Sequence, residues 1–312
     1  MRGRRAADEG EENVRGRSVF RGAGTALVTP FTREGALDET ALRRLVRRQV
    51  EGGIDFLVPC GTTGETPTLS AHEQERVVAV TLEEAKGRVP VLAGAGSNDT
   101  KKAMEQARSM AGLGARGVLS VGPYYNKPTP EGFFRHFSAI ADTSPVPVVI
   151  YNVPGRTGSN IDARTLLRLA EHENLAAVKE ASGNLGQIME ILRDRPAGFG
   201  VLSGDDAFTL ALLVLGAEGV VSVVSNQVPG EMHELAAAGL RGDFAEARRL
   251  HNRLLDLMNL NFVESSPIPV KASLALLGLC EESFRLPLCP PKESTREALR
   301  AALRKLGLLG AP

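Results

Sequence analysis

The chain has 312 residues, which is ample for one large α/β domain with a substantial core. Its 37 Lys and Arg balance 37 Asp and Glu, so the charge gives no electrostatic case for nucleic-acid binding. Three scattered cysteines make no disulfide framework, and no apolar run approaches the roughly 20 residues that span a membrane, so we expect a cytoplasmic protein without a membrane segment.

Residues 1–18 are rich in Arg, Glu and Gly and contain no apolar core. This composition excludes a secretory signal and predicts a disordered N-terminal extension.

The next 200 residues alternate short β-branched runs with amphipathic patterns. Strands are predicted at 24–28, 56–59, 90–93, 117–121, 146–150, 176–179, 200–203 and 219–223. Helices are predicted at 38–51, 70–86, 99–113, 129–141, 162–171, 185–193 and 205–215. Buried strands that alternate with helices specify a parallel sheet, and eight such units predict a closed (β/α)8 TIM barrel over 19–228. An open doubly wound sheet is the alternative, but it usually has fewer strands.

Beyond this region the strand signals stop. The patterns at 230–240, 244–259, 268–278 and 294–306 all predict helices. We therefore expect a small C-terminal helical region over 229–312.

In such a barrel the active site lies at the carboxyl ends of the strands. After the second predicted strand comes Gly61-Thr62-Thr63-Gly64-Glu65. The glycines permit a tight turn, and the hydroxyl and N–H groups suit a carboxylate. The alternative is an ordinary Gly/Thr loop.

All three tyrosines fall at predicted strand ends: Tyr124 and Tyr125 after the fourth strand, and Tyr151 after the fifth. A tyrosine can transfer protons when a neighbour polarises its hydroxyl, although packing at a loop is the simpler interpretation of each one alone. Arg156 follows on a constrained turn. Two interpretations are open: its guanidinium binds a carboxylate through two hydrogen bonds, or it forms a salt bridge at the surface.

The sixth predicted strand ends in Lys179. Burial beside Ala176 and Val178 favours the neutral amine, which can attack a carbonyl and form a Schiff base. Alternatively, Lys179 merely ends a strand and reaches solvent. After the seventh strand, Asp205 and Asp206 are interpreted as an acidic helix cap, and Gly204 offers its backbone to a ligand.

The five histidines show no metal-ligand spacing, and the glycines at 94–96 lack the third glycine of a dinucleotide fingerprint. Taken together and in order, the motifs at 61–65, 124–126, 151–158, 178–183 and 203–206 resemble one family. It is the 4-hydroxy-tetrahydrodipicolinate (dihydrodipicolinate) synthases, which are class I aldolase-like pyruvate lyases. The resemblance runs from about residue 20 to 290 and includes 264–271 and 285–288.

The resemblance implies roles in pyruvate binding and proton transfer. Lys179 would form a Schiff base with the keto carbon of pyruvate. Thr62 and Thr63 would hold the pyruvate carboxylate, with Thr63 also in a proton relay. Tyr151 would be the central acid/base, and Tyr125 would enter the site of a neighbouring subunit.

It further implies that Arg156 binds the carboxylate of aspartate semialdehyde, and that Gly204 and Val221 line the site through their backbones. The expected reaction is condensation of pyruvate with this aldehyde, the committed step of lysine and diaminopimelate biosynthesis. Neither a metal nor an organic cofactor is implied. The expected assembly is a homotetramer, a dimer of dimers.

Two other functions stay open at this point. Sugar-acid aldolases of the same superfamily share the lysine and the Gly-Thr-Thr loop, and Arg156 argues for the synthase over them. A non-catalytic barrel would form no pyruvate adduct. Gln74 and Lys102 align with a histidine and a glutamate of lysine-inhibited members, while Asn98 and Tyr124 are retained, so we expect weak feedback inhibition by lysine.

Overall fold

The computed structural model describes residues 20–310, so the predicted extension at 1–18 lies outside the described residues. Eight strands follow one another along the chain: β1 (Gly22–Ala26), β2 (Phe56–Val58), β3 (Leu92–Gly94), β4 (Gly117–Val121), β5 (Val148–Asn152), β6 (Leu175–Glu180), β7 (Gly200–Ser203) and β8 (Gly219–Ser222).

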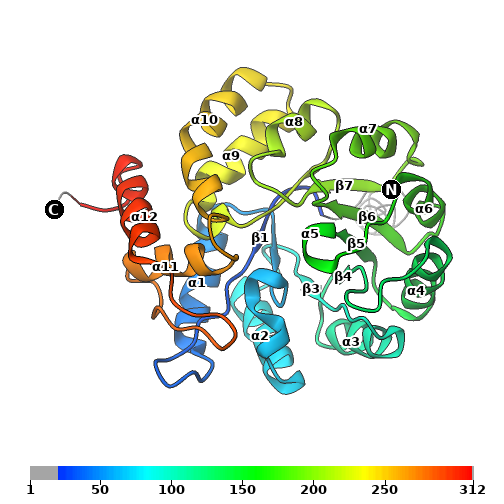
Figure 1. Ribbon diagram of the computed structural model, residues 1–312, viewed down its shortest axis with the longest axis horizontal. Helices are drawn as coiled ribbons and strands as arrows, with labels where there is room; N and C mark the ends of the chain where they lie inside the picture. The colour runs from blue at the N-terminus through cyan, green and yellow to red at the C-terminus, as the bar shows by residue number, and fades with distance from the viewer. Residues whose placement is uncertain (1–19, 311–312) are drawn as a thin grey trace, which may run out of the picture.

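These strands form one parallel sheet in the order β2-β1-β8-β7-β6-β5-β4-β3 (Figure 1). A parallel bridge between Leu57 and Val91 joins the two ends of this order. The Gly94 amide also donates to the Pro59 carbonyl, at 2.9 Å. The predicted (β/α)8 barrel is therefore confirmed.

The helices that follow the eight strands begin at polar caps in most cases. They are α1 (Glu39–Glu51), α2 (Ala71–Ala85), α3 (Thr100–Gly112), α4 (Pro130–Thr143), α6 (Ala163–Ala170), α7 (Leu185–Asp194), α8 (Thr209–Val214) and α9 (Pro229–Leu240). Ser70 and Glu73 form a capping box at the start of α2. The helix predicted at 205–215 begins only at Thr209, and the short helix α5 (Pro154–Thr157) was not predicted. Among residues 20–310, no helix is long and apolar enough to cross a membrane.

Two aromatic rings fill the barrel near the amino ends of its strands. Phe20 and Phe56 pack edge to face, with ring centroids 5.5 Å apart. A Cβ atom at Gly117 would lie 2.6 Å from the Phe20 ring, and one at Gly24 would lie 2.0 Å from the Phe56 ring. The glycines therefore make room for the two rings inside the barrel.

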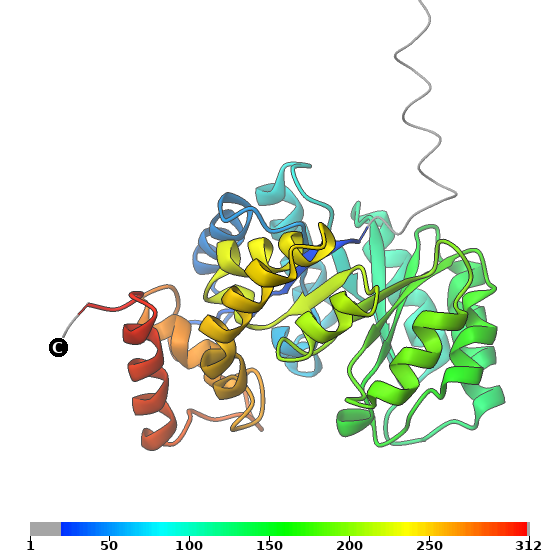
Figure 2. The same cartoon turned by 90° about the horizontal axis from the view of Figure 1, so that it is seen from above.

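Three further helices complete the chain: α10 (Phe244–Leu260), α11 (Ile268–Leu276) and α12 (Glu293–Lys305). Figures 1 and 2 both show α11 and α12 at one side of the barrel, opposite α4 and α6. A small apolar cluster joins α11 to α1 and to the carboxyl ends of β1 and β8; its members are Val28, Leu45, Val223, Val270 and Leu274. The division between 228 and 229 stays a prediction, and α9 beyond it still packs on β1 and β8.

Candidate active site

Lys179 and Tyr151 lie side by side at the carboxyl ends of β6 and β5. The two residues are register partners, and the Lys179 Nζ lies 4.0 Å from the centroid of the Tyr151 ring. Each residue is only 6% exposed, which excludes the alternative that Lys179 reaches solvent. The structure thus brings the predicted nucleophile and the predicted acid/base into contact.

The next residue on each strand holds this pair in register. Asn152 and Glu180 are also register partners, and the Asn152 Nδ2 donates to the Glu180 Oε2 at 3.0 Å. The Glu180 carboxylate also accepts the Ser182 amide at 2.7 Å. Burial raises the pKa of Glu180, and these hydrogen bonds oppose the rise.

Gly204 lies against the stem of Lys179. Its amide donates to the Glu180 carbonyl at 2.8 Å. A Cβ atom at this position would lie 3.2 Å from the Lys179 Cε and 2.6 Å from the Ala181 Cβ. A side chain here would press on the lysine, so the close approach of β6 and the chain after β7 requires glycine.

The interpretation of Asp206 as a helix cap is wrong. Its buried carboxylate accepts the amides of Val223 and Val224, at 3.0 and 2.8 Å, and so ties the chain after β7 to the chain after β8. Burial raises the pKa of Asp206 to about 6. Val221, on β8, is buried in the same inner cluster as Tyr151.

Thr62 and Thr63 lie on a 3₁₀ turn, η2 (Thr62–Gly64), just after β2. Thr63 is buried, Thr62 is half-buried, and the Thr29 hydroxyl donates to the Gly64 carbonyl at 2.8 Å. A second 3₁₀ turn, η3 (Thr66–Thr68), follows directly. The threonines are thus at the same end of the barrel as Lys179, on a turn anchored to the chain after β1.

Two residues in left-handed backbone conformation flank this turn, Cys60 at φ +56° and Glu65 at φ +53°. A Cβ atom at Gly94 would lie 1.8 Å from the Cys60 carbonyl oxygen, so the chain crosses β3 where only glycine fits. Cys60 is buried, and its burial raises the pKa of its thiol to about 12.

Tyr125 and Arg156 lie at the rim, and neither is brought onto Lys179 within this chain. Tyr125 is 91% exposed, with φ at +70°, on the loop after β4. Arg156 is exposed on α5, and its Nη2 donates to the Ser266 carbonyl at 3.2 Å.

Behind the threonine turn lies a buried polar cluster that was not predicted from the sequence. The Lys271 Nζ lies 2.5 Å from the Glu65 Oε1, and both side chains are fully buried. Arg285 binds Glu73 with two hydrogen bonds of 2.9 and 2.6 Å and lowers the pKa of that carboxyl to about 2. Glu65, Lys271 and Arg285 all belong to motifs of the resemblance, but 206 residues separate the buried pair, so no local pattern joins them.

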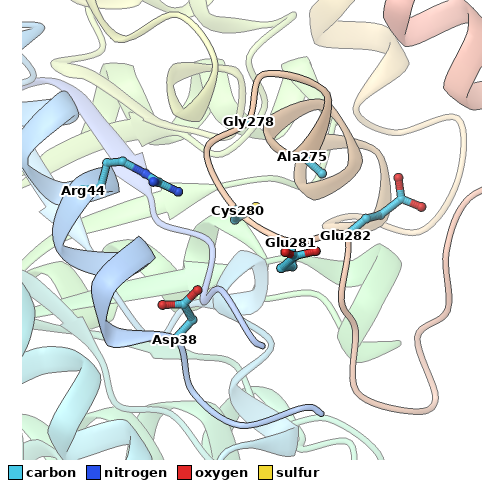
Figure 3. A pocket seen from close by; sticks show the side chains of 7 residues that line it. All are labelled: Asp38, Arg44, Ala275, Gly278, Cys280, Glu281 and Glu282. Atoms are coloured by element: carbon cyan, nitrogen blue, oxygen red, sulfur yellow. The ribbon is translucent and has the colours of Figure 1, made fainter. Parts of the chain in front are cut away.

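A pocket lies between α1 and the segment after α11 (Figure 3). It is lined by Asp38, Arg44, Ala275, Gly278, Cys280, Glu281 and Glu282, none of which was predicted as a site residue. The Arg44 guanidinium donates to the Leu279 carbonyl at 2.6 Å, so α1 and the segment after α11 are hydrogen-bonded to each other beside this pocket.

Comparison with known proteins agrees with this geometry. The model of the dihydrodipicolinate synthetase family matches residues 19–306. The chain is 54% identical to a 4-hydroxy-tetrahydrodipicolinate synthase of Koribacter versatilis over 291 residues, which are 93% of this chain and 97% of the relative.

Two solved structures are similar over nearly their whole length. A chloride-inhibited dihydrodipicolinate synthase from Acinetobacter baumannii, complexed with pyruvate, has a TM-score of 0.91 at 40% identity and covers 93% of this chain and 99% of its own. A monomeric dihydrodipicolinate synthase variant has a TM-score of 0.92 at 45% identity and covers 93% and 98%. The resemblance inferred from the motifs is confirmed, and the synthase is favoured over the sugar-acid aldolase.

Proposed function

Since the chain belongs to the dihydrodipicolinate synthetase family, we propose that it condenses pyruvate with L-aspartate 4-semialdehyde through a Schiff base on Lys179. The product is 4-hydroxy-tetrahydrodipicolinate, which commits carbon to lysine and diaminopimelate. The observation that carries the proposal is the contact between the Lys179 Nζ and the Tyr151 ring, 4.0 Å from its centroid, at the carboxyl ends of β6 and β5.

The first half of the reaction builds a nucleophile from pyruvate. The neutral amine of Lys179 attacks the keto carbon, and loss of water leaves an iminium. Thr62 and Thr63 hold the carboxylate, which fixes the keto carbon against the amine. Tyr151 moves protons to and from the leaving water as the general acid/base, with Thr63 in the relay.

The second half joins the two substrates. The iminium withdraws electrons, so the pyruvate methyl group loses a proton and becomes an enamine that attacks the aldehyde carbon. Arg156 binds the carboxylate of the semialdehyde and orients it. The amine of the semialdehyde then displaces Lys179 and closes the ring, while the backbones of Gly204 and Val221 line the site.

The remaining role requires a second subunit. Tyr125 is 91% exposed on its own chain, which supports the proposal that it completes the relay in a neighbour's site. This role needs at least a dimer, and we propose the homotetramer, a dimer of dimers, that the resemblance to the family implies. If sedimentation finds only monomers, and these monomers are fully active, then Tyr125 does not act in a neighbour's site. The three free cysteines support a reducing, cytoplasmic setting.

The experiment that tests the reaction is turnover of pyruvate plus aspartate semialdehyde, followed through a coupling reductase. Wild-type protein should turn over, and Lys179→Ala should not. Arg156→Ala should raise the KM for the aldehyde by about 10–100-fold, because a charge-assisted pair is lost. A pyruvate adduct without turnover of this aldehyde would keep the Schiff base and redirect the assignment to a sugar-acid aldolase.

A further inference from the structure

The strongest unexplained feature is the buried ion pair that joins the threonine turn to helix α11. The Lys271 Nζ and the Glu65 Oε1 lie 2.5 Å apart, and neither side chain is exposed. The ammonium also lies over the Phe31 ring, 4.1 Å from its centroid. These two residues take no part in the proposed chemistry.

A buried ion pair adds little net stability to a core, because its desolvation penalty offsets the attraction between the charges. Two charges lose their hydration on burial, and apolar side chains of similar volume often stabilise a site as well or better. What the pair does specify is position, because an ammonium and a carboxylate in contact fix the place of both chain segments. The segment that it fixes on the barrel is the end of the threonine turn.

Glu65 needs an external anchor because of its backbone. It has φ +53° directly after the turn Thr62–Gly64, and its amide donates to the Thr62 carbonyl at 3.1 Å. A residue other than glycine holds a left-handed conformation only where its surroundings impose it. The bond from the carboxylate to Lys271 supplies that constraint.

Arg285, which follows α11 in the chain, binds the residues that come after the threonine turn. The Arg285 guanidinium donates to the Thr68 carbonyl at 2.8 Å and binds Glu73 at the start of α2. Arg285 also lies over the Phe31 ring, 4.3 Å from its centroid. The chain from the threonine turn to α2 is therefore held by the C-terminal helical region as well as by the barrel.

We propose that Glu65 and Lys271 are positioning residues, through which α11 holds the Thr62–Thr63 turn in the conformation that receives the carboxylate of a 2-oxo acid. The inference rests on the proposed function, because it takes these threonines as the carboxylate-binding groups. It assigns the C-terminal helical region a part in substrate affinity.

The test compares three variants with the wild type. Lys271→Met leaves the Glu65 carboxylate buried without its partner, whereas Glu65→Met/Lys271→Met removes both charges and replaces the pair with apolar side chains of roughly similar size, so we expect the double variant to fold even where the single one does not. Arg195→Met is a control for the loss of an ion pair away from the threonine turn. It breaks an ion pair with Glu218, 2.7 Å long, near the amino ends of β7 and β8.

Steady-state kinetics give the first readout. The double variant should raise the KM for pyruvate about tenfold or more, with a smaller change in the KM for the aldehyde, because only the pyruvate carboxylate loses its preset site. Arg195→Met should leave the KM for pyruvate unchanged, whatever it does to the melting temperature. A folded double variant with the wild-type KM for pyruvate would overturn the proposal.

Hydrogen exchange of the unliganded protein gives a second readout that needs no substrate. The amides of Gly64 and Glu65 are hydrogen-bonded within the turn, so they should exchange faster in the double variant and not in the control. Unchanged exchange of these amides would contradict the proposal. If the wild type fails to turn over pyruvate, the proposed function fails, and the exchange result still decides whether the pair positions the turn.

Discussion

Gly204→Ala tests the packing of the reactive lysine with one methyl group. The added Cβ would lie 2.6 Å from the Ala181 Cβ and 3.2 Å from the Lys179 Cε. Carbon atoms prefer about 3.5–4.0 Å, so the chain after β7 or the end of β6 must move by about 1 Å. Overpacking of this kind costs about 1–3 kcal/mol of unfolding free energy. A displacement of about 1 Å at a reacting group costs on the order of 100-fold in rate.

The assay is the rate at which borohydride traps pyruvate on the protein, measured beside a urea titration. The matched control is Gly112→Ala, in the last turn of α3, where nothing lies within 4 Å of the new Cβ. It should trap pyruvate at the wild-type rate and be more stable by about 0.5–1 kcal/mol. Trapping by Gly204→Ala at the wild-type rate, with wild-type stability, would refute the packing argument.

Three further predictions rest on other parts of the molecule. Burial lowers the pKa of His136 to about 4, so its neutral form stabilises the fold above the unfolded pKa of about 6.5, and that stability is lost as the pH falls toward 4. Between pH 7 and pH 5 the wild type should lose about 2 kcal/mol more than His136→Gln, as urea titrations would measure. Gly94→Ala should prevent folding, seen as loss of soluble protein, because the new Cβ would lie 1.8 Å from the Cys60 carbonyl oxygen. Lysine should inhibit weakly, since Gln74 already donates to the Leu69 carbonyl at 3.2 Å, and since Lys102, at the other differing position, is a cation that repels the effector's amine; inhibition below millimolar concentration in a rate assay would contradict this.

The barrel was predictable because its signals are local. Eight apolar runs and a series of capping residues each act within a few positions, as the capping box of Ser70 and Glu73 does at the start of α2. The contact between Lys179 and Tyr151 was also predictable, because successive parallel strands end at the same edge of the sheet.

The remaining features depend on contacts that no local pattern encodes. Asp206 has the composition of a helix cap, yet its carboxylate binds backbone amides 17 and 18 residues away. The pair of Glu65 and Lys271 spans 206 residues. A glycine that is required only because another segment crosses it, as at Gly94, looks in the sequence like any other glycine.

The most direct test of the proposed Schiff base is to find which residue forms the covalent adduct with pyruvate. The wild-type protein is incubated with pyruvate, reduced with borohydride, digested, and its peptides are analysed by mass spectrometry. One adduct is expected, on Lys179, and none on the other deeply buried lysine, Lys271. An adduct on another residue, or full turnover by Lys179→Ala, would contradict this expectation.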